Sequence, residues 1–161
     1  ELDRGAVLTP SFLIDMDKVF EDFVFRAIGE RLSIPGTRWR QGKTTTLDEA
    51  GRIRIKPDLS LWRGGSCCFV GDAKYKATDV GDNDDLYQLL AYVRATGLES
   101  GLLVYATTAR QASTHVVRYD GARLHVRQLD LTASEPALLK DVADLSRYIA
   151  GTSTAASAVA S

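Results

Sequence analysis

The sequence predicts an α/β fold in which helices flank a central mixed sheet, and three observations favour it. Apolar side chains recur at helical spacing over residues 15–32 and again over residues 84–96. Between these segments, over residues 38–76, the period changes to two, as it does in strands. Residues 101–107 are then mostly apolar, which is typical of a strand buried on both faces of a sheet. Helical and strand segments in this order predict helices packed on a sheet.

The first helix is predicted over residues 15–32. Asp15 is a residue type that caps helices, and the apolar side that follows it contains Met16, Val19, Phe20, Phe23, Val24, Ala27 and Ile28. Turn-forming residues then interrupt the period of two at residues 48–51 and again at residues 64–66. We therefore expect a meander of three antiparallel strands.

A polar loop over residues 77–83 precedes the second helix, which Gly97 is expected to end. The buried stripe of this helix is predicted to contain Leu86, Leu89, Leu90 and Val93. Residues 113–119 and 122–129 follow the apolar strand and predict a hairpin that turns at Asp120-Gly121.

The last helix is predicted from a cap at Ser134 to about Ala150, with Gly151 after it. The residues beyond it are mostly Ala, Ser and Thr and have little to bury. We therefore expect a single domain over residues 1–150 and an Ala/Ser-rich tail over residues 151–161.

The composition excludes several classes of protein. The formal net charge is −1, so affinity for nucleic acid must come from a local patch or from a partner. Cys67 and Cys68 are adjacent, which suits neither a disulfide framework nor a metal site and favours an intracellular, cytoplasmic location. No apolar run approaches the roughly 20 residues that span a bilayer, so we expect no membrane association. The chain begins with Glu1 rather than Met, which indicates a piece of a longer protein.

Charged side chains concentrate on one face of the second and third predicted strands. In the second strand this face contains Arg52, Arg54, Lys56, Asp58 and Ser60. In the third strand, Asp72 and Lys74 share a face, opposite Gly71 and Ala73. Because a short turn joins the two antiparallel strands, they can bring Asp58 beside Asp72 and Lys74.

Two carboxylates and an ammonium group in one place suit the hydrolysis of a phosphodiester. The oxygens of Asp58 and Asp72 are hard ligands of the kind that Mg²⁺ prefers, and we expect Mn²⁺ to substitute for it. The metal would polarise the phosphate, neutralise charge in the transition state and help to generate hydroxide. Lys74 would orient or deprotonate the attacking water, or stabilise the developing charge.

This pattern resembles the PD-(D/E)XK nuclease motif. Pro57-Asp58 is followed, at a spacing of fourteen, by Asp72-Ala73-Lys74. Glu21 resembles the acidic residue in the first helix of these nucleases, and residues 88–92 resemble the QxxxY signature of the RecB-like branch. The resemblance implies a restriction-endonuclease-like fold and a catalytic group of Asp58, Asp72, Lys74 and Glu21. It also implies a metal held by Asp58, Asp72 and the main-chain carbonyl of Ala73, with Glu21 as a further candidate ligand.

Longer runs, at residues 12–16, 19–24 and 72–76, are similar to the C-terminal nuclease domain of the McrC family. McrC is the cleaving subunit of McrBC modification-dependent restriction systems, and the resemblance extends over about residues 12–107. It implies a Mg²⁺-dependent DNA endonuclease that acts with an McrB-like AAA+ GTPase. The segments of McrC that would engage this GTPase are absent from the present sequence.

Each candidate residue also has a simpler structural interpretation. Glu21 lies at the edge of the apolar stripe, where a solvated helix carboxylate is the alternative to a catalytic role. Gln88 and Tyr92 lie one turn apart and would support the site or contact DNA, or form a surface hydrogen-bonded pair. His115 and His125 are expected to be ordinary strand residues. A solvated loop with a helix cap is expected for the acidic run Asp79, Asp82, Asp84 and Asp85.

Contacts with DNA are expected from a local excess of positive charge. Residues 38–76 contain nine basic and four acidic side chains. Arg52, Arg54 and Lys56 are predicted to align toward Asp58 and to contact phosphates without reading bases. Trp62 would either stack on a base or cover the sheet.

Two other functions fit the same residues. Within the enzyme class, the chain would be a stand-alone or RecB-like nuclease of DNA repair or defence. From a different class, it would be a non-catalytic nucleic-acid-binding module of the same fold. Clustered acids that face phosphates are of no use to a binding module, so the sequence favours a nuclease.

Overall fold

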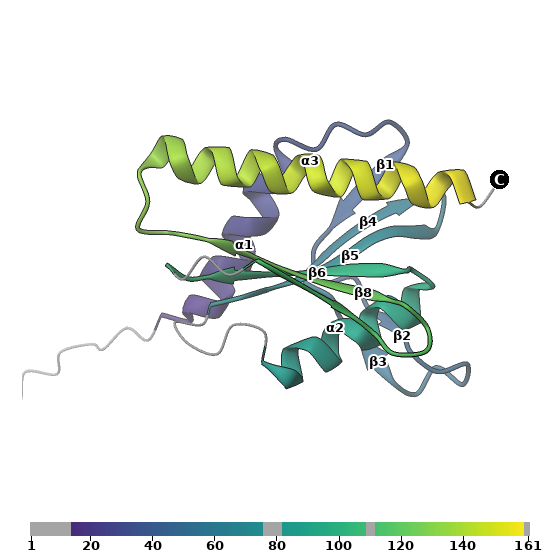
Figure 1. Cartoon of the computed structure of the whole chain (residues 1–161). Coiled ribbons are helices and arrows are strands. Elements are labelled where there is room, and N and C mark those ends of the chain that lie inside the picture. Colours follow the sequence, from purple (N-terminus) through teal and green to yellow (C-terminus); the bar gives the residue numbers. More distant parts are fainter. Residues whose placement is uncertain (1–13, 76–81, 109–111, 160–161) are drawn as a thin grey trace, which may run out of the picture.

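The computed structural model describes residues 14–75, 82–108 and 112–159. These residues form a six-stranded sheet, a two-stranded ribbon and three helices (Figure 1). The helices are α1 (Met16–Gly29), α2 (Asn83–Thr96) and α3 (Glu135–Val159). The large sheet contains β1 (Thr37–Arg40), β4 (Leu59–Arg63), β5 (Ser66–Lys74), β6 (Ser100–Ala106), β7 (Ser113–Val116) and β8 (Arg123–Leu129). The ribbon contains β2 (Thr45–Thr46) and β3 (Arg54–Ile55). The predicted α/β class with a central mixed sheet is confirmed.

The strands of the large sheet lie in the order β1-β4-β5-β6-β8-β7. β1, β4 and β5 are antiparallel neighbours. β5, β6 and β8 are parallel, because α2 connects β5 to β6 as a crossover, and β7 is antiparallel to β8. The predicted hairpin at Asp120-Gly121 is confirmed, with Gly121 at a φ of 74° that a residue with a side chain rarely adopts.

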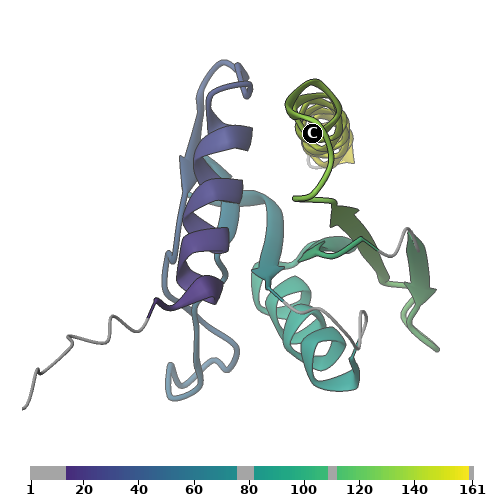
Figure 2. The ribbon, with the colours of Figure 1, turned by 90° about the vertical axis from the view of Figure 1, so that its left-hand side faces the viewer.

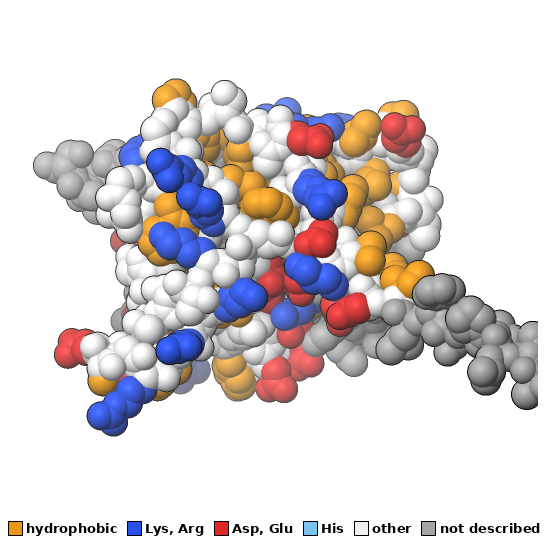
Figure 3. Space-filling model, turned by 180° about the vertical axis from the view of Figure 1, so that it is seen from behind, with side chains coloured by type: hydrophobic (Ala, Val, Ile, Leu, Met, Phe, Trp, Pro, Cys, Tyr) orange, Lys and Arg blue, Asp and Glu red, His pale blue; other side chains and the backbone are white. Residues whose placement is uncertain are grey.

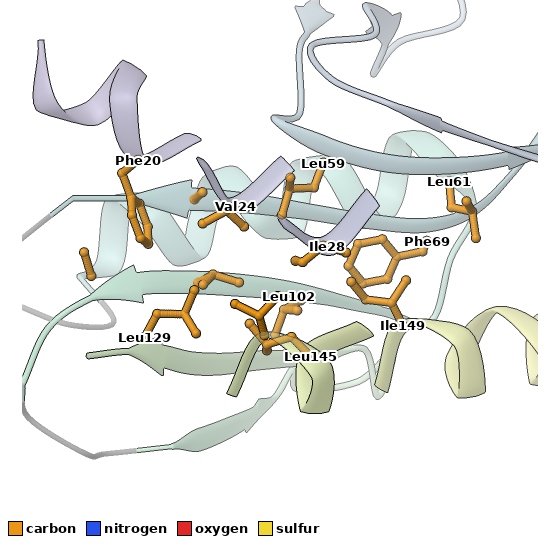
Figure 4. Close-up of a cluster of buried hydrophobic side chains, with 14 residues drawn as sticks. Phe20, Val24, Ile28, Leu59, Leu61, Phe69, Leu102, Leu129, Leu145 and Ile149 are labelled. Carbon is orange, nitrogen blue, oxygen red and sulfur yellow. The ribbon is translucent and has the colours of Figure 1, made fainter. Parts of the chain in front are cut away.

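Helices cover both faces of the sheet, so each face has its own core. On one face, Phe20, Val24 and Ile28 of α1 and Val142, Leu145 and Ile149 of α3 pack on the strands (Figure 4). On the other face, Leu89, Tyr92 and Val93 of α2 pack on Val70, Leu103 and Tyr105. Figure 2 shows α2 on the side of the sheet opposite α3. The alternation along β5 therefore directs Val70 toward α2 and Phe69 and Ala73 toward α1 and α3.

The predicted ends of the first two helices are largely confirmed. Asp15 caps α1 by accepting a hydrogen bond from the amide of Lys18, at 3.2 Å, but the helix ends at Gly29 rather than at residue 32. Met16 and Val19 were expected on the buried side of α1, and both are exposed, at 40% and 50%. In α2, Gly97 ends the helix in the left-handed conformation, as predicted.

The buried stripe of α2 differs from the prediction. The fully buried side chains are Asp85, Leu89, Tyr92 and Val93, whereas Leu86 and Leu90 are only partly buried. The helix is therefore rotated so that one acidic and one aromatic polar group face the sheet. The predicted loop before α2 lies mostly outside the described residues.

The predicted meander is confirmed as the antiparallel strands β1, β4 and β5, but its second predicted strand is not continuous. It is divided into β3, which belongs to the ribbon, and β4, which belongs to the large sheet. Pro57 lies between them, has no amide hydrogen to donate, and restricts the backbone of the residue before it. The carbonyl oxygen of Pro57 accepts a hydrogen bond from the amide of Gly42, at 3.0 Å, instead of a ladder bond. The even-numbered side chains of β3 and β4 therefore do not form one strip.

The last helix extends beyond its predicted end at Ala150. α3 runs through Gly151 to Val159, so residues 151–159 of the predicted Ala/Ser-rich tail continue the helix. Ser153 is fully buried, and its hydroxyl donates to the carbonyl oxygen of Ile149, at 2.7 Å. Thr152 likewise donates to the carbonyl oxygen of Ile149, at 3.0 Å. Within the described ranges, none of the helices is both long and apolar enough to cross a membrane.

Candidate active site

Asp58 and Asp72 are brought together by the pairing of β4 with β5. Leu59 pairs with Gly71 in the antiparallel register, so the next residues outward, Asp58 and Asp72, lie opposite each other. Each carboxylate accepts a main-chain hydrogen bond from the other strand. The amide of Ala73 donates to Asp58 Oδ2 at 3.1 Å, and the amide of Asp58 donates to Asp72 Oδ1 at 3.4 Å. The two side chains thus continue the ladder beyond the last paired residues.

Lys74 completes this group from the same face of β5. Its Nζ lies 2.7 Å from Asp72 Oδ2, and both side chains are largely withdrawn from solvent, at 22% and 2% exposure. Asp72 Oδ2 is nevertheless buried without an aligned hydrogen-bond donor among the described residues. One buried carboxylate oxygen therefore faces a positive charge and retains the capacity to accept another ligand.

Asp72 and burial change the protonation of Asp58. Burial, a hydrogen bond with Asp72 and the charge of Asp72 raise the pKa of Asp58 to about 7. The amide of Ala73 and the charge of Lys74 act in the opposite direction and do not compensate. The Asp58 carboxyl group therefore titrates near neutral pH instead of in the ordinary acidic range.

Lys74 remains an ammonium group in this environment. Burial lowers its pKa, but the charges of Asp72, Asp58 and Asp85 outweigh burial, and the net pKa is raised above its ordinary value. The side chain can therefore act as a fixed positive charge or as a hydrogen-bond donor. Of the roles expected for Lys74, charge stabilisation and orientation of water fit this protonation state better than proton abstraction.

Glu21 approaches the group from α1. Burial and the charge of Asp58 raise the pKa of Glu21, while Lys18 and Lys74 act to lower it. Its carboxylate forms an ion pair with Lys18, at 3.6 Å, and 22% of the side chain is exposed. Glu21 is therefore close enough for the charge of Asp58 to affect its pKa, as a catalytic role requires. Its ion pair with Lys18 also agrees with the solvated helix carboxylate that was the alternative. A hydrogen bond also joins α1 to the end of β5, because the amide of Tyr75 donates to Asp17 Oδ1 at 3.1 Å.

Tyr92 and Gln88, predicted as a pair, have different environments. Tyr92 is buried, and its hydroxyl donates to the carbonyl oxygen of Lys56, at 3.4 Å. Burial, followed by the charges of Asp72, Asp58 and Glu21, raises the pKa of Tyr92, so its hydroxyl stays protonated beside the acids. Gln88 is exposed on the surface of α2. Of the two, Tyr92 therefore supports the backbone that leads into Asp58.

Asp85 is a residue of this region that sequence reasoning missed. Asp82 caps α2 as expected, with Oδ1 at 3.3 Å from the amide of Asp84, and Asp84 is exposed. Asp85, which was grouped with them as solvated, is 7% exposed and accepts a hydrogen bond from the hydroxyl of Tyr105, at 2.7 Å. A signal was present, because Asp85, Leu89 and Tyr92 follow one another at the spacing of one helix face.

The acidic group fits a hard divalent cation. Within residues 14–75, 82–108 and 112–159, no three His, Cys, Asp or Glu side chains gather as the ligands of a metal ion. Mg²⁺ often binds through one or two carboxylates and keeps several waters, so Asp58 and Asp72 are sufficient as side-chain ligands. A cation would give the buried Oδ2 of Asp72 a further partner and would oppose the effects that raise the pKa of Asp58.

The other predicted residues lie at the margin of the site or away from it. Arg52, Arg54 and Lys56 are exposed, on or beside the two-stranded ribbon, and do not share a face of the large sheet with Asp58. Their predicted alignment toward Asp58 along one strand is therefore wrong. His115 and His125 are strand residues, as expected, and His125 packs edge-on against Tyr148 with ring centroids 5.5 Å apart.

Comparison with known families agrees with the resemblance seen in the sequence. The family described as McrBC 5-methylcytosine restriction system component matches residues 2–106 of the 161 residues. That range includes α1 and the strands that carry Asp58, Asp72 and Lys74. Comparison with curated proteins gives no match. Because the matched range is more than half of the sequence, the chain belongs to the McrBC 5-methylcytosine restriction system component family.

Proposed function

We propose that this chain is the nuclease domain of a McrBC-like restriction system and cuts DNA with the help of Mg²⁺. The fold we assign to it is that of the PD-(D/E)XK nucleases. One observation supports this most directly: the carboxylates of Asp58 and Asp72 accept hydrogen bonds from the amides of Ala73 and Asp58, with Lys74 Nζ 2.7 Å from Asp72. Two paired acids beside a buried ammonium are suited to a phosphodiester and have no evident use in a structural module.

Asp58, Asp72 and the main-chain carbonyl of Ala73 would hold the metal, with Glu21 as a further candidate ligand. Bound Mg²⁺ would neutralise charge on the phosphate and lower the pKa of an attacking water. We expect Mn²⁺ to support the reaction as well, and Ca²⁺ to bind without supporting it.

The residues of the chain have separate tasks in this proposal. Lys74 presents a fixed positive charge to the phosphate oxygens and orients the attacking water. The amide of Ala73 keeps Asp58 oriented toward Asp72. Tyr92 bonds to the carbonyl of Lys56 and so positions the backbone immediately before Pro57 and Asp58. Glu21 adds negative charge on the α1 side, where Lys18 moderates it.

The partners in this proposal are DNA and an McrB-like AAA+ GTPase. The family description names a 5-methylcytosine restriction system, so the preferred substrate is DNA that carries this modification. With a formal net charge of −1, the chain alone has little general attraction for DNA. We therefore expect slow cleavage by the chain alone, and faster cleavage when the GTPase and the rest of the McrC-like protein bring it to modified DNA.

The experiment is a cleavage assay with and without the GTPase partner and GTP, on methylated and unmethylated DNA of the same sequence. The unchanged chain should cut methylated DNA when partner, GTP and Mg²⁺ are all present. Asp58→Asn should abolish cutting without preventing assembly, which gel filtration measures. Rapid cutting of unmodified DNA without the partner would favour a stand-alone nuclease instead, and full activity of Asp58→Asn would remove the proposed site.

A further inference from the structure

A basic hollow lies on the same face of the sheet as the candidate active site, over β1 and β4. It has a volume of about 380 Å³ and is lined by three cations, one indole ring and three glycines. The cations are Arg38, Arg40 and Lys43, and the ring is that of Trp62. Among the described residues, no ion pair involves any of these three cations, and no acidic side chain lines the hollow. Figure 3 shows the corresponding side of the molecule, where Lys and Arg side chains gather beside a group of acidic ones.

The register of the strands places this hollow in line with Asp58. Arg38 pairs with Trp62 and Arg40 pairs with Ser60, so these side chains share a face of the sheet. Asp58 lies two and four residues before Ser60 and Trp62, and the alternation of a strand therefore directs it to the same face. Four residues of strand span about 13 Å. The hollow is thus a continuation of the active-site face rather than an unrelated surface.

Two side chains of the hollow, those of Trp62 and Lys43, are held in place. The indole Nε1 of Trp62 donates to the Ser60 hydroxyl at 2.9 Å, and that hydroxyl donates to the carbonyl oxygen of Arg40 at 3.2 Å. The ammonium of Lys43 then lies 3.2 Å from the centre of the Trp62 ring, as a cation–π pair. The ring is therefore fixed by the sheet and in turn positions the Lys43 charge beside the two arginines. Lys43 therefore covers one face of the Trp62 ring.

Three cations without carboxylate partners, held in a hollow, form a site for a polyanion. Guanidinium groups match the paired oxygens of a phosphate, and an ammonium adds a point charge. Glycines at the rim leave the approach open, because a Cβ added at Gly36, Gly64 or Gly65 would meet nothing within 4 Å. The helix α2 packs on β5 and β6, whereas the hollow lies over β1 and β4.

We propose that Arg38, Arg40 and Lys43 bind the sugar–phosphate backbone of DNA on one side of the cleaved bond, and that Trp62 is a positioning residue for Lys43. This proposal rests on the proposed function, because Asp58 defines which bond is cleaved. A separation of about 13 Å corresponds to roughly four nucleotides of one strand at 3.4 Å each. The hollow therefore holds the strand a few nucleotides from the scissile phosphate, without reading bases.

The test uses the full chain, a 20-base-pair DNA duplex and EDTA, so that binding is measured without cleavage. The variant Arg38→Ala/Arg40→Ala/Lys43→Ala changes the net charge from −1 to −4. A matched control, Arg118→Ala/Lys140→Ala/Arg147→Ala, makes the same change at exposed positions away from the hollow. The first variant should bind roughly 10²-fold more weakly at low salt, and its slope of log K against log salt should be shallower by roughly 2–3. The control should bind nearly as the unchanged chain does.

The role of Trp62 is tested by two substitutions and one fluorescence signal. Trp62→Phe keeps a ring for Lys43 and should retain most of the affinity, whereas Trp62→Ala should lose roughly tenfold. DNA binding should change the fluorescence emission of Trp62. A Trp39→Phe chain should show the same change, because Trp39 lies on the opposite face of the sheet, where it donates to the carbonyl of Phe25 and stacks on the Phe25 ring.

Three results would overturn the proposal: no measurable DNA binding by the unchanged chain at low salt, equal losses in the two triple variants, or equally tight binding of an acidic polypeptide. Failure here is separable from failure of the proposed function. If the hollow variant binds normally while Asp58→Asn loses cleavage, only the present inference is wrong. If the hollow variant loses binding while Asp58→Asn cuts normally, the catalytic assignment is wrong and the hollow remains a DNA site.

Discussion

Strands β4 and β6 lie on either side of β5, and they present different side chains to the face on which α2 packs. β6 presents Leu103 and Tyr105, which are fully buried in the α2 core. β4 presents Ser60 and Trp62, and Asp58 precedes it. The helix contacts β5 and β6, so the face is apolar beneath it and polar beyond it. β5 contains the boundary, because Val70 belongs to the α2 core and Asp72 and Lys74 follow on the same face.

One face of the sheet supports both folding and chemistry, because α2 covers only part of it. Substitutions on the β4 side should therefore affect activity more than stability, and substitutions on the β6 side should affect stability more than activity.

The largest effect is expected for Asp72→Asn in β5. The substitution keeps the shape of the side chain and removes its charge, so cleavage by the assembled restriction complex should fall by at least about 10³-fold. Circular dichroism should show that the fold is retained, although thermal stability should fall because the largely buried Lys74 ammonium loses the carboxylate 2.7 Å away. Asp141→Asn, in α3, is the matched control and should change neither quantity. Normal cleavage by Asp72→Asn would contradict the division of this sheet face into a side for activity and a side for stability.

Leu103→Ala is the counterpart in β6. Leu103 is fully buried beneath α2, and truncation should cost about 2–5 kcal/mol of unfolding free energy. Denaturant titration measures this, with Leu139→Ala as a control, since Leu139 is 39% exposed and its truncation should cost about 0.5 kcal/mol or less. The folded fraction of Leu103→Ala should keep its cleavage activity. A specific loss of activity at full folding would show that the two sides are coupled.

The pH dependence of stability should separate the two sides as well. In the metal-free chain the pKa of Asp58 is raised from 3.8 to about 7, so its contribution to stability is greatest below 3.8 and is lost as pH rises through 7. Asp58→Asn mimics the protonated form and should be more stable than the unchanged chain at pH 8, in EDTA, with no such advantage near pH 4. The groups that face Asp58 are Asp72, Lys74, Glu21 and Tyr92. An advantage that does not change with pH would contradict the assignment of this titration to Asp58.

The smallest effect on cleavage is expected at Tyr105 and Asp85, where the α2 core meets the candidate active site. The Tyr105 hydroxyl of β6 donates to buried Asp85 Oδ2 at 2.7 Å, and the charge of Asp85 helps to keep Lys74 protonated. Tyr105→Phe should cost about 1–3 kcal/mol of unfolding free energy and leave cleavage within a fewfold of normal. Tyr87→Phe, at a 66% exposed position of α2, should be neutral. A large loss of cleavage with Tyr105→Phe would extend the active site into the α2 core.

The pattern of the sequence was sufficient to predict the α/β class and the pairing of Asp58 with Asp72. Both depend on local alternation and on a short turn, which a single sequence displays. The pattern did not predict the break in the strand at Pro57, because the break depends on residues that are distant in the sequence. Gly42 donates a hydrogen bond to the carbonyl of Pro57, and Tyr92 donates one to the carbonyl of Lys56. The predicted strip of Arg52, Arg54 and Lys56 failed for the same reason.

Burial of polar groups was the other feature that local patterns did not reveal. Asp85 is buried because Tyr105, twenty residues later, supplies a donor. Gly151 does not end α3, because Thr152 and Ser153 bond back to the helix and Ser153 packs inward. The basic hollow was missed because its side chains come from β1, the following loop and β4, and only their pairing brings them together.

Calorimetric titration with Mn²⁺ measures whether Asp58 and Asp72 together hold a divalent metal. The unchanged chain should bind one Mn²⁺ at the site, and titrations at pH 7 in buffers of different ionisation enthalpy should show release of protons from Asp58, whose pKa is about 7 before the metal binds. Asp58→Asn/Asp72→Asn should bind at least about 10²-fold more weakly, without proton release. Undiminished affinity in the double variant would contradict the account, because the metal would then lie elsewhere.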